Sequence, residues 1–289
     1  MERQLLRALY QLLRQLTATG SSGGCRYSDF WILLTYFWSV LSDRPISWAC
    51  RADNWPAGFE SFTPPSPATM SRRLHRPVAR WLLVRVLQYL QQFMALSNMH
   101  YIDAKPLCVG GSSGDRDARI GWGAARLAKG YKIHAIIQAS GRLQALAIEP
   151  MNRNDTSMAP ALIDQLRLSP GYLVGDTAYD ADRLYDQAAA HGLQLVATPR
   201  VAKKGLGHKR HSPRRLAGLE IARSLPGQQM LRDRFCIDRH FGHWGNLPGG
   251  LWGLPNFVRH LDRVRCWVLA KLSLVSLLRL PENKHLRHR

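Results

Sequence analysis

The chain has 289 residues, of which 46% are hydrophobic and 21% are charged, and these ordinary values argue against a disordered or fibrous protein. Forty lysine and arginine residues against twenty acidic residues give a formal charge of +20, so a polyanion, and nucleic acid first, is the expected partner. The five cysteines form no CxxC pair, so neither a zinc finger nor a disulfide framework is expected. The most apolar runs, 30–41 and 267–278, are shorter than the roughly 18 residues that span a bilayer, so no membrane partner is expected.

The first 98 residues are predicted to form a helical N-terminal domain. Leucines spaced three to four residues apart over 5–16 indicate an amphipathic helix, which the glycine- and serine-rich residues 20–24 end. Further helices are expected over 27–41 and 78–94. Residues 1–98 therefore precede the rest of the chain as an all-helical domain.

A short basic helix is expected between these two helices. Ser66 suits an N-cap and Pro67 the first helical position. After a helix around 46–52, this segment predicts a helix-turn-helix motif whose second helix enters the major groove of DNA. The alternative is a basic surface helix of a small bundle. The expected DNA contacts on this helix are Arg72, Arg73 and Arg76.

From residue 99 the pattern changes to apolar runs of strand length. Strands are predicted over 101–109, 130–138, 143–149, 171–175 and 193–198, with helices over 155–166 and 182–191. Residues 110–123 are rich in glycine and polar residues and are expected to form a loop, and the turn at 140–142 predicts a hairpin. This order predicts an α/β domain of two or three layers whose first three strands are antiparallel.

The catalytic domain is expected to cover residues 99–289. It includes a basic insertion at about 201–234, which has few apolar residues, and C-terminal helices near 234 and over 257–280. Basic residues of this kind release counterions from phosphates and so favour DNA binding. The expected DNA contacts in the insertion are Lys203, Lys204, Arg214 and Arg215.

Two carboxylates stand in or at the end of apolar strands. Asp103 lies within the first predicted strand, and Asp176 ends the fourth. An ionised carboxylate that is removed from water is unfavourable unless it is paired or bound to a metal. Either residue alone is explained by a turn or by a nearby arginine, but the two together predict a Mg²⁺ site for two-metal phosphoryl transfer.

Four segments carry a resemblance to a known family: Tyr-Ile-Asp at 101–103, Gly-Tyr-Lys-Ile-His at 130–134, Gly-Asp-Thr-Ala-Tyr-Asp at 175–180 and Arg-Phe-Cys-Ile-Asp-Arg-His-Phe-Gly at 234–242. In this order they resemble DDE transposases of bacterial insertion sequences, in groups four and five. The resemblance covers roughly residues 100–280. It implies an RNase H-like catalytic domain, a mixed sheet with flanking helices, behind an all-helical DNA-binding domain.

The same resemblance implies an activity and its partners. The expected reaction is phosphodiester hydrolysis and strand transfer at the ends of an insertion sequence, with Mg²⁺ or Mn²⁺ as cofactor. The implied partners are double-stranded DNA, both the terminal inverted repeats of the element and the target, and a second copy of the chain that forms a homodimer on DNA. The implied location is the bacterial cytoplasm, in association with the nucleoid.

The resemblance also assigns the catalytic acids. Asp103 is the first metal-binding acid and Asp176 the second. In the family the third is a glutamate in an Arg-x-x-x-Glu arrangement, and here Arg234 and Asp238 stand in that frame, with aspartate in the glutamate position. Glu220 is the competing third acid, and its alternative is an ordinary solvated helix residue.

Four further residues are expected to contact phosphate. Lys132 and His134 share one face of the second predicted strand, because side chains alternate along a strand, and beside Asp103 they would contact the scissile phosphate. The alternative for His134 is a structural histidine. Arg234 and Arg239 offer bidentate contacts to phosphate, and their alternative is a salt bridge to a neighbouring acid.

Two other functions stay open at this point. With aspartate at position 238, the chain is a catalytically degenerate or co-opted DNA-binding protein in one alternative. In the other it is an RNase H-like nuclease that cuts RNA or structured DNA without strand transfer.

Overall fold

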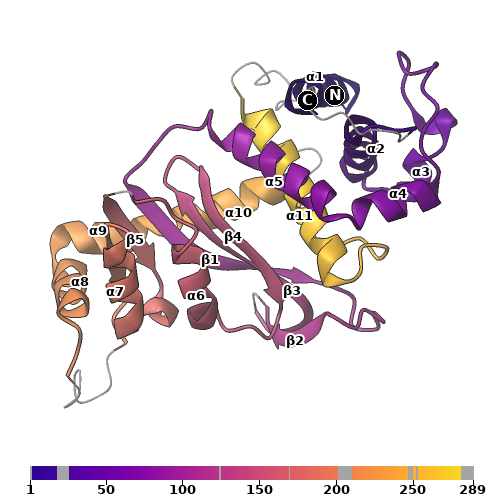
Figure 1. Cartoon of the computed structure of the whole chain (residues 1–289). Helices are drawn as coiled ribbons and strands as arrows, with labels where there is room; N and C mark the ends of the chain where they lie inside the picture. The colour runs from indigo at the N-terminus through magenta and orange to yellow at the C-terminus, as the bar shows by residue number, and fades with distance from the viewer. Residues whose placement is uncertain are drawn as a thin grey trace. The chain divides into compact units, whose positions relative to one another are not determined.

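The chain divides into two units of different secondary structure. The computed structural model describes residues 2–17, 26–123, 125–168, 170–200, 210–246, 250–251 and 253–280. One unit combines residues 1–93 with 243–289, and the other spans 94–242. The first is helical and the second is an α/β unit (Figure 1).

The helical unit is built from amphipathic and fully apolar helices. The leucine stripe of α1 (Glu2–Thr17) is buried against α2 (Asp29–Leu41), and α2 itself is buried on almost all sides. The remaining elements are α3 (Ile46–Ala49), η1 (Ala52–Asn54), α4 (Pro67–Leu74), α5 (Pro77–Gln91) and α11 (Leu261–Arg279).

The C-terminal helix α11 belongs to the helical unit. It packs against α5 and α2, and its residues from Trp267 to Leu278 are buried. The Gln91 side chain donates a buried hydrogen bond of 2.7 Å to the Ser276 hydroxyl, and Lys271 lies 2.7 Å from Asp43. From the sequence, residues 257–280 are expected in the catalytic domain, because chain order does not reveal that α2 and α5 pack against this helix.

The basic helix begins as the sequence predicted. The Ser66 side chain accepts a hydrogen bond from the Thr69 N–H, with Pro67 as the first residue of α4. The connection between α3 and α4, however, is longer than in the helix-turn-helix motif that the sequence predicts. Residues 50–66 separate the four-residue α3 from α4, whereas that motif joins its helices by a turn of about 3–4 residues.

Within the described residues, six strands form one mixed sheet. The central strand β1 pairs antiparallel with β3 and parallel with β5, and β5 pairs parallel with β6. The β3–β4 hairpin turns at Gly141, whose φ of 87° suits glycine. This order confirms the RNase H-like fold. The strands are β1 (Met99–Cys108), β2 (Arg119–Trp122), β3 (Leu127–Gln138), β4 (Leu143–Pro150), β5 (Gly171–Gly175) and β6 (Leu193–Ala197).

Strand β2 corrects the sequence prediction of a loop over 110–123. It pairs antiparallel with the first residues of β3, which begins three residues before its predicted start. Ile120 and Trp122 of β2 are exposed. Because no alternation of buried and exposed residues marks β2, its sequence resembles that of a loop.

Helices cover the sheet and complete its core. The helices α6 (Asp155–Ile163) and α7 (Asp182–Ala190) share a hydrophobic core with Ile102 and Ile136 of the sheet. None of the helices in the described part of the chain has both the length and the apolar character of a membrane span. The other elements are η2 (Thr177–Tyr179), α8 (Pro213–Arg223), α9 (Leu225–Asp233) and α10 (Cys236–Asn246).

Replacement of Leu173 tests the core of the α/β unit. Leu173 is fully buried in β5, so Leu173→Ala is expected to lower the free energy of unfolding by about 2–5 kcal/mol. Leu168 is 78% exposed, and Leu168→Ala is the matched control, with an expected change within about 0.5 kcal/mol. Urea unfolding followed by circular dichroism measures both, and equal losses would contradict this description of the core.

Candidate active site

The parallel pairing of β1 with β5 places two acids side by side. Tyr101 of β1 is in register with Val174 of β5. Asp103 lies two residues beyond Tyr101 in β1, and Asp176 lies two residues beyond Val174, directly after the end of β5, so the two acids occupy equivalent positions along neighbouring chain segments. Asp176 also caps η2, because its side chain accepts a hydrogen bond of 2.8 Å from the Ala178 N–H.

Asp103 is a largely buried carboxylate with one cationic partner. Its side chain is 20% exposed, and it accepts hydrogen bonds from Arg234 at 3.0 Å and from the Ala104 N–H at 2.8 Å. The pKa of Asp103 is raised to about 6, and burial is the main cause. The hydrogen bond from the Ala104 N–H and the charge of Arg234 lower the pKa, whereas the charges of Asp176 and Asp238 raise it. One arginine therefore does not compensate this group of acids.

The junction of α9 and α10 supplies the third acid of this group. Arg234 follows α9 directly, and Asp238 lies in the first turn of α10, four residues later. Asp238 is exposed. The carboxylate oxygens of Asp103, Asp176 and Asp238 do not all lie within 4.8 Å of one another in the described part of the chain. The structure therefore groups these acids electrostatically without gathering them around one point.

Glu220, the competing third acid, lies elsewhere in the α/β unit. It is an exposed residue of α8, a helix that packs against β6 and α7. The charge of Asp238, by contrast, acts on Asp103 and raises its pKa. The electrostatic surroundings of Asp103 thus favour Asp238 over Glu220.

The sheet register corrects the expected position of Lys132 and His134. Asp103 is opposite Ala135, and Ala104 is opposite His134, so Lys132 and His134 lie on the other face of the sheet from Asp103. The sequence shows correctly that the two share a face, but the face relative to Asp103 depends on a register that only strand pairing fixes.

Lys132 and His134 instead reach the start of α6. The Lys132 amine lies 3.1 Å from Asp155 Oδ1, and His134 Nδ1 lies 3.5 Å from the same oxygen. His134 is fully buried, and burial lowers its pKa to about 4 against the charge of Asp155. Asp155 is the first residue of α6, after the N-cap Asn154. Because Lys132 is paired and His134 is buried and neutral, neither side chain is placed to contact DNA.

Comparison with known families agrees with this arrangement of strands and acids. Residues 101–241 match the model of the family described as the transposase DDE domain. The chain carries a transposase DDE domain. The match begins in β1 and ends in α10, so it contains Asp103, Asp176 and Asp238. No curated protein matches the chain.

The family connects the chain to transposition. DDE transposases depend on divalent metal ions and act on DNA, so a divalent cation and DNA are the cofactor class and the substrate class that the domain implies. The match confirms the resemblance to DDE transposases. Groups four and five within the family stay a prediction.

The three arginines expected on the basic helix differ in their exposure to solvent. Arg72 and Arg76 are exposed. Arg73 is buried, where it pairs with the Asp29 carboxylate and donates a hydrogen bond of 2.8 Å to the Tyr27 carbonyl. Arg73 therefore connects α4 to the start of α2, and its buried guanidinium is not placed to contact DNA.

The other basic residues that are expected to contact DNA also differ in their exposure and pairing. Arg214 on α8 and Arg239 on α10 are exposed. Arg234 forms its salt bridge with Asp103, which is distant in the chain, whereas the sequence alternative was an acid next to it in the chain. Lys203 and Lys204 lie outside the described residues.

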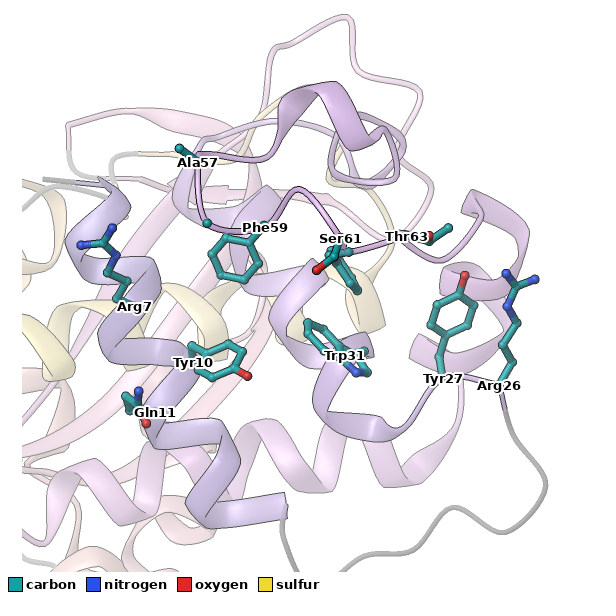
Figure 2. A pocket seen from close by; sticks show the side chains of 12 residues that line it. Arg7, Tyr10, Gln11, Arg26, Tyr27, Trp31, Ala57, Phe59, Ser61 and Thr63 are labelled. Atoms are coloured by element: carbon teal, nitrogen blue, oxygen red, sulfur yellow. The ribbon is translucent and has the colours of Figure 1, made fainter.

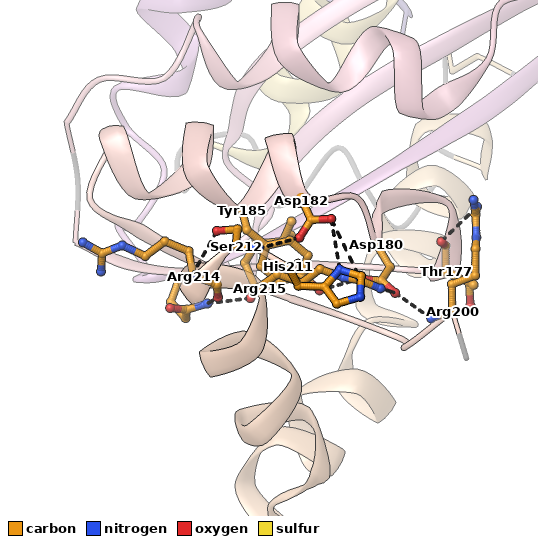
Figure 3. A network of polar contacts seen from close by, with 11 residues as sticks. Thr177, Asp180, Asp182, Tyr185, Arg200, His211, Ser212, Arg214 and Arg215 are labelled. Carbon is orange, nitrogen blue, oxygen red and sulfur yellow. Dashed lines mark hydrogen bonds and ion pairs between the residues drawn. The ribbon is translucent and has the colours of Figure 1, made fainter. Parts of the chain in front are cut away.

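Arg215 forms the centre of a buried network next to Asp176. Its guanidinium donates hydrogen bonds of 2.7 and 2.8 Å to the two carboxylate oxygens of Asp180, which also accept from the Tyr185 hydroxyl and the Arg200 N–H (Figure 3). Burial raises the pKa of Asp180, but these hydrogen bonds outweigh it and hold the pKa below its ordinary value. The network fastens η2, and so Asp176, to α8.

This network corrects one sequence prediction. The sequence predicts that Arg215 contacts DNA, but the structure pairs it with Asp180. In the structure both side chains are buried against each other. Because the two residues lie 35 positions apart, no local pattern in the sequence indicates the pair.

Tyr179 belongs to the 175–180 segment, and no role for it is predicted from the sequence. It is fully buried, and its hydroxyl has no hydrogen-bond partner among the described residues. Burial raises its pKa, as do the charges of Asp103, Asp155 and Asp176. A Cβ at Gly175 would lie 2.8 Å from the Tyr179 ring, so a larger residue at position 175 would clash with this ring. The Gly-Asp-x-x-Tyr spacing is the sequence signal that could have identified Tyr179.

Replacement of Asp103 tests the electrostatics of the metal-free protein. The folded-state pKa of about 6 exceeds the ordinary value near 3.9, so the ionised carboxylate destabilises the folded protein increasingly as the pH rises from about 4 to 7. Asp103→Asn is therefore expected to be more stable than wild type at pH 8, by up to about 3 kcal/mol, and equally stable at pH 4.

Urea unfolding at the two pH values, without metal ions, measures this difference. Asp233→Asn is the matched control, because Asp233 is an exposed acid at the end of α9, and no gain at pH 8 is expected from it. A loss of stability in Asp103→Asn at pH 8 would contradict a raised pKa.

Replacement of Arg215 tests the buried network. Arg215→Met leaves the Asp180 carboxylate without its cationic partner and is expected to cost about 3–5 kcal/mol at pH 7. Because the pKa of Asp180 is lowered in the folded protein, the stabilising effect is present above the ordinary pKa near 4 and is lost as the pH falls through the folded value. The exposed Arg214→Met is the control, and unfolding curves at pH 7 and pH 3 give the comparison. A cost that is the same at both pH values would mean that lost packing, and not the ion pair, accounts for it.

Proposed function

We propose that the chain is a DNA transposase of the insertion-sequence class, in groups four and five. It hydrolyses a phosphodiester at the ends of its element and directs the freed 3′-hydroxyl at target DNA. The observation that carries this proposal is the side-by-side placement of Asp103 and Asp176 at neighbouring strands of a DDE domain, with Asp238 close enough to raise the pKa of Asp103.

We propose Mg²⁺ or Mn²⁺ as the cofactor, held by Asp103, Asp176 and Asp238. Carboxylate oxygens are the hard ligands that these ions prefer. Asp103 is paired with Arg234, and the raised pKa of Asp103 indicates that this pairing does not offset the burial of the carboxylate and the charges of Asp176 and Asp238. When bound, such ions activate the attacking oxygen and neutralise the charge on the leaving oxygen.

Arg234, directly after α9, and Arg239 of α10 have a proposed role on the substrate. Arg234 satisfies Asp103 in the metal-free protein, and a metal ion on the same carboxylate would compete with it. Its guanidinium is then available to the scissile phosphate, which it can contact in a bidentate way. Arg239 is exposed one residue after Asp238 and supplies a second phosphate contact.

The exposed basic residues extend the proposed contact with DNA. Arg72 and Arg76 belong to the helical unit and Arg214 to the DDE domain, and all three are exposed. Lys203 and Lys204 join this set on sequence grounds alone. The proposed DNA comprises the terminal inverted repeats and the target, and a homodimer brings two ends together in the cytoplasm, where bacterial DNA lies.

A second candidate function is a DNA-binding protein without catalysis. The observation that favours it is Asp238, because aspartate is one methylene shorter than the glutamate of the family arrangement. The charge of Asp238 is among the causes that raise the pKa of Asp103, after burial as the main cause, and this supports a place for Asp238 in the site. We therefore keep catalysis as the first proposal, and the two candidates are separated by one assay.

Strand transfer of pre-cleaved element ends into plasmid DNA tests the proposal. With Mg²⁺ or Mn²⁺, wild type is expected to join ends, and alanine at Asp103, Asp176 or Asp238 is expected to reduce joining about 10³-fold, which corresponds to several kcal/mol of lost stabilisation. Asp238→Glu is expected to retain activity, because it restores the ligand of the family.

Two controls complete this assay. Asp233→Ala removes an exposed acid near the site, and Glu220→Ala removes the competing third acid; both are expected to keep activity within about threefold. If wild type is inert and still binds end DNA, the second candidate replaces the first. If it cuts strands but never joins them, the chain is a nuclease.

A further inference from the structure

A pocket in the helical unit has no part in the proposed chemistry. It opens between α1, the start of α2 and residues 57–63, and its volume is about 660 Å³, within the range of ligand sites (Figure 2). Tyr10 and Trp31 lie on the helices below the loop, and Phe59 lies in the loop above them. The pocket therefore has aromatic walls on both sides.

The aromatic rings of the pocket are only partly covered. The Tyr10 ring centre lies 6.3 Å from that of Trp31 and 6.1 Å from that of Phe59, and Trp31 stacks on Phe62 at 4.3 Å. All four side chains are half-buried, although rings that serve only as core are usually enclosed. Half-buried rings in a cavity offer free faces for stacking.

The charge of the pocket suits an anionic ligand with a planar group. Arg7 and Arg26 are exposed lining residues, which stand at opposite sides of the pocket in Figure 2. None of the lining residues in the described part of the chain is Asp or Glu. Gln11, Ser61 and Thr63 add polar groups at the rim, of the kind that bind the edge of a base.

We propose that this pocket receives an unpaired nucleobase of a DNA strand. Stacking on aromatic rings together with arginine contacts to the backbone is the general chemistry by which proteins bind single-stranded nucleic acid. A base within a duplex is covered by its neighbours and must leave the stack before it can enter a cavity, so an unpaired base enters at a lower cost. The inference rests on DNA as the partner under the proposed function, and it adds a strand-state preference that the DDE domain does not supply.

Fluorescence titration of the full chain tests the inference. The probes are a 20-base-pair duplex, the same duplex with one bulged 2-aminopurine, and the labelled single strand. Stacking of one base on aromatic rings is expected to make wild type bind the bulged duplex about tenfold more tightly than the perfect one, with quenching of the 2-aminopurine.

The variants separate the pocket from general charge effects. Tyr10→Leu removes one stacking surface, and Arg7→Gln removes one cation from an exposed position where folding is not at risk. Both are expected to lose most of the bulge preference. Arg3→Gln is the matched control, because Arg3 is exposed on the same helix outside the pocket, and it is expected to keep the preference.

The possible outcomes test the pocket assignment and the proposed function separately. Strong binding of all three probes without preference or quenching overturns the pocket assignment and leaves the proposed function intact. An equal effect of Arg7→Gln and Arg3→Gln also overturns it, since general charge then explains the binding. If no probe is bound at all, DNA is not the partner and the proposed function fails first.

Discussion

The parallel ladder between β1 and β5 is the constraint on which the site depends. It fixes Tyr101 opposite Val174, and the acids two residues further along each strand become neighbours although they are 73 positions apart in the chain. A slip of one residue would turn Asp103 to the other face of the sheet. The apolar core that α6 and α7 form on that face resists such a slip, so packing far from the acids sets their geometry.

The site is held together at some cost in stability. The buried Asp103 carboxylate is unfavourable in the metal-free protein, and its neighbours Asp176 and Asp238 increase that cost. The ion pair of Asp180 with Arg215 is the opposite kind of feature, because each charge satisfies the other. Such a combination is typical of active sites, where functional groups destabilise the fold and surrounding structure compensates.

Much of this architecture could be predicted from local sequence patterns. Strand-length apolar runs, the Ser66 cap and the turn at 140–142 depend on neighbouring residues, and the structure confirms them. The errors concern partners that are distant in the chain. Nothing near Lys132 shows which face Asp103 occupies, and nothing near Arg215 shows that Asp180 will bury it. The acids at 103 and 176 were predictable because a carboxylate in an apolar strand is itself a local anomaly.

The residues on either side of 201–209 are both fastened to the segment that follows Asp176. The Arg200 N–H binds Asp180, and the Ser212 N–H binds Asp182 at 2.8 Å. The segment that follows Asp176 is therefore held from two separate parts of the chain. Because both donors are backbone N–H groups, a substitution of the Arg200 or Ser212 side chain would leave these two hydrogen bonds in place.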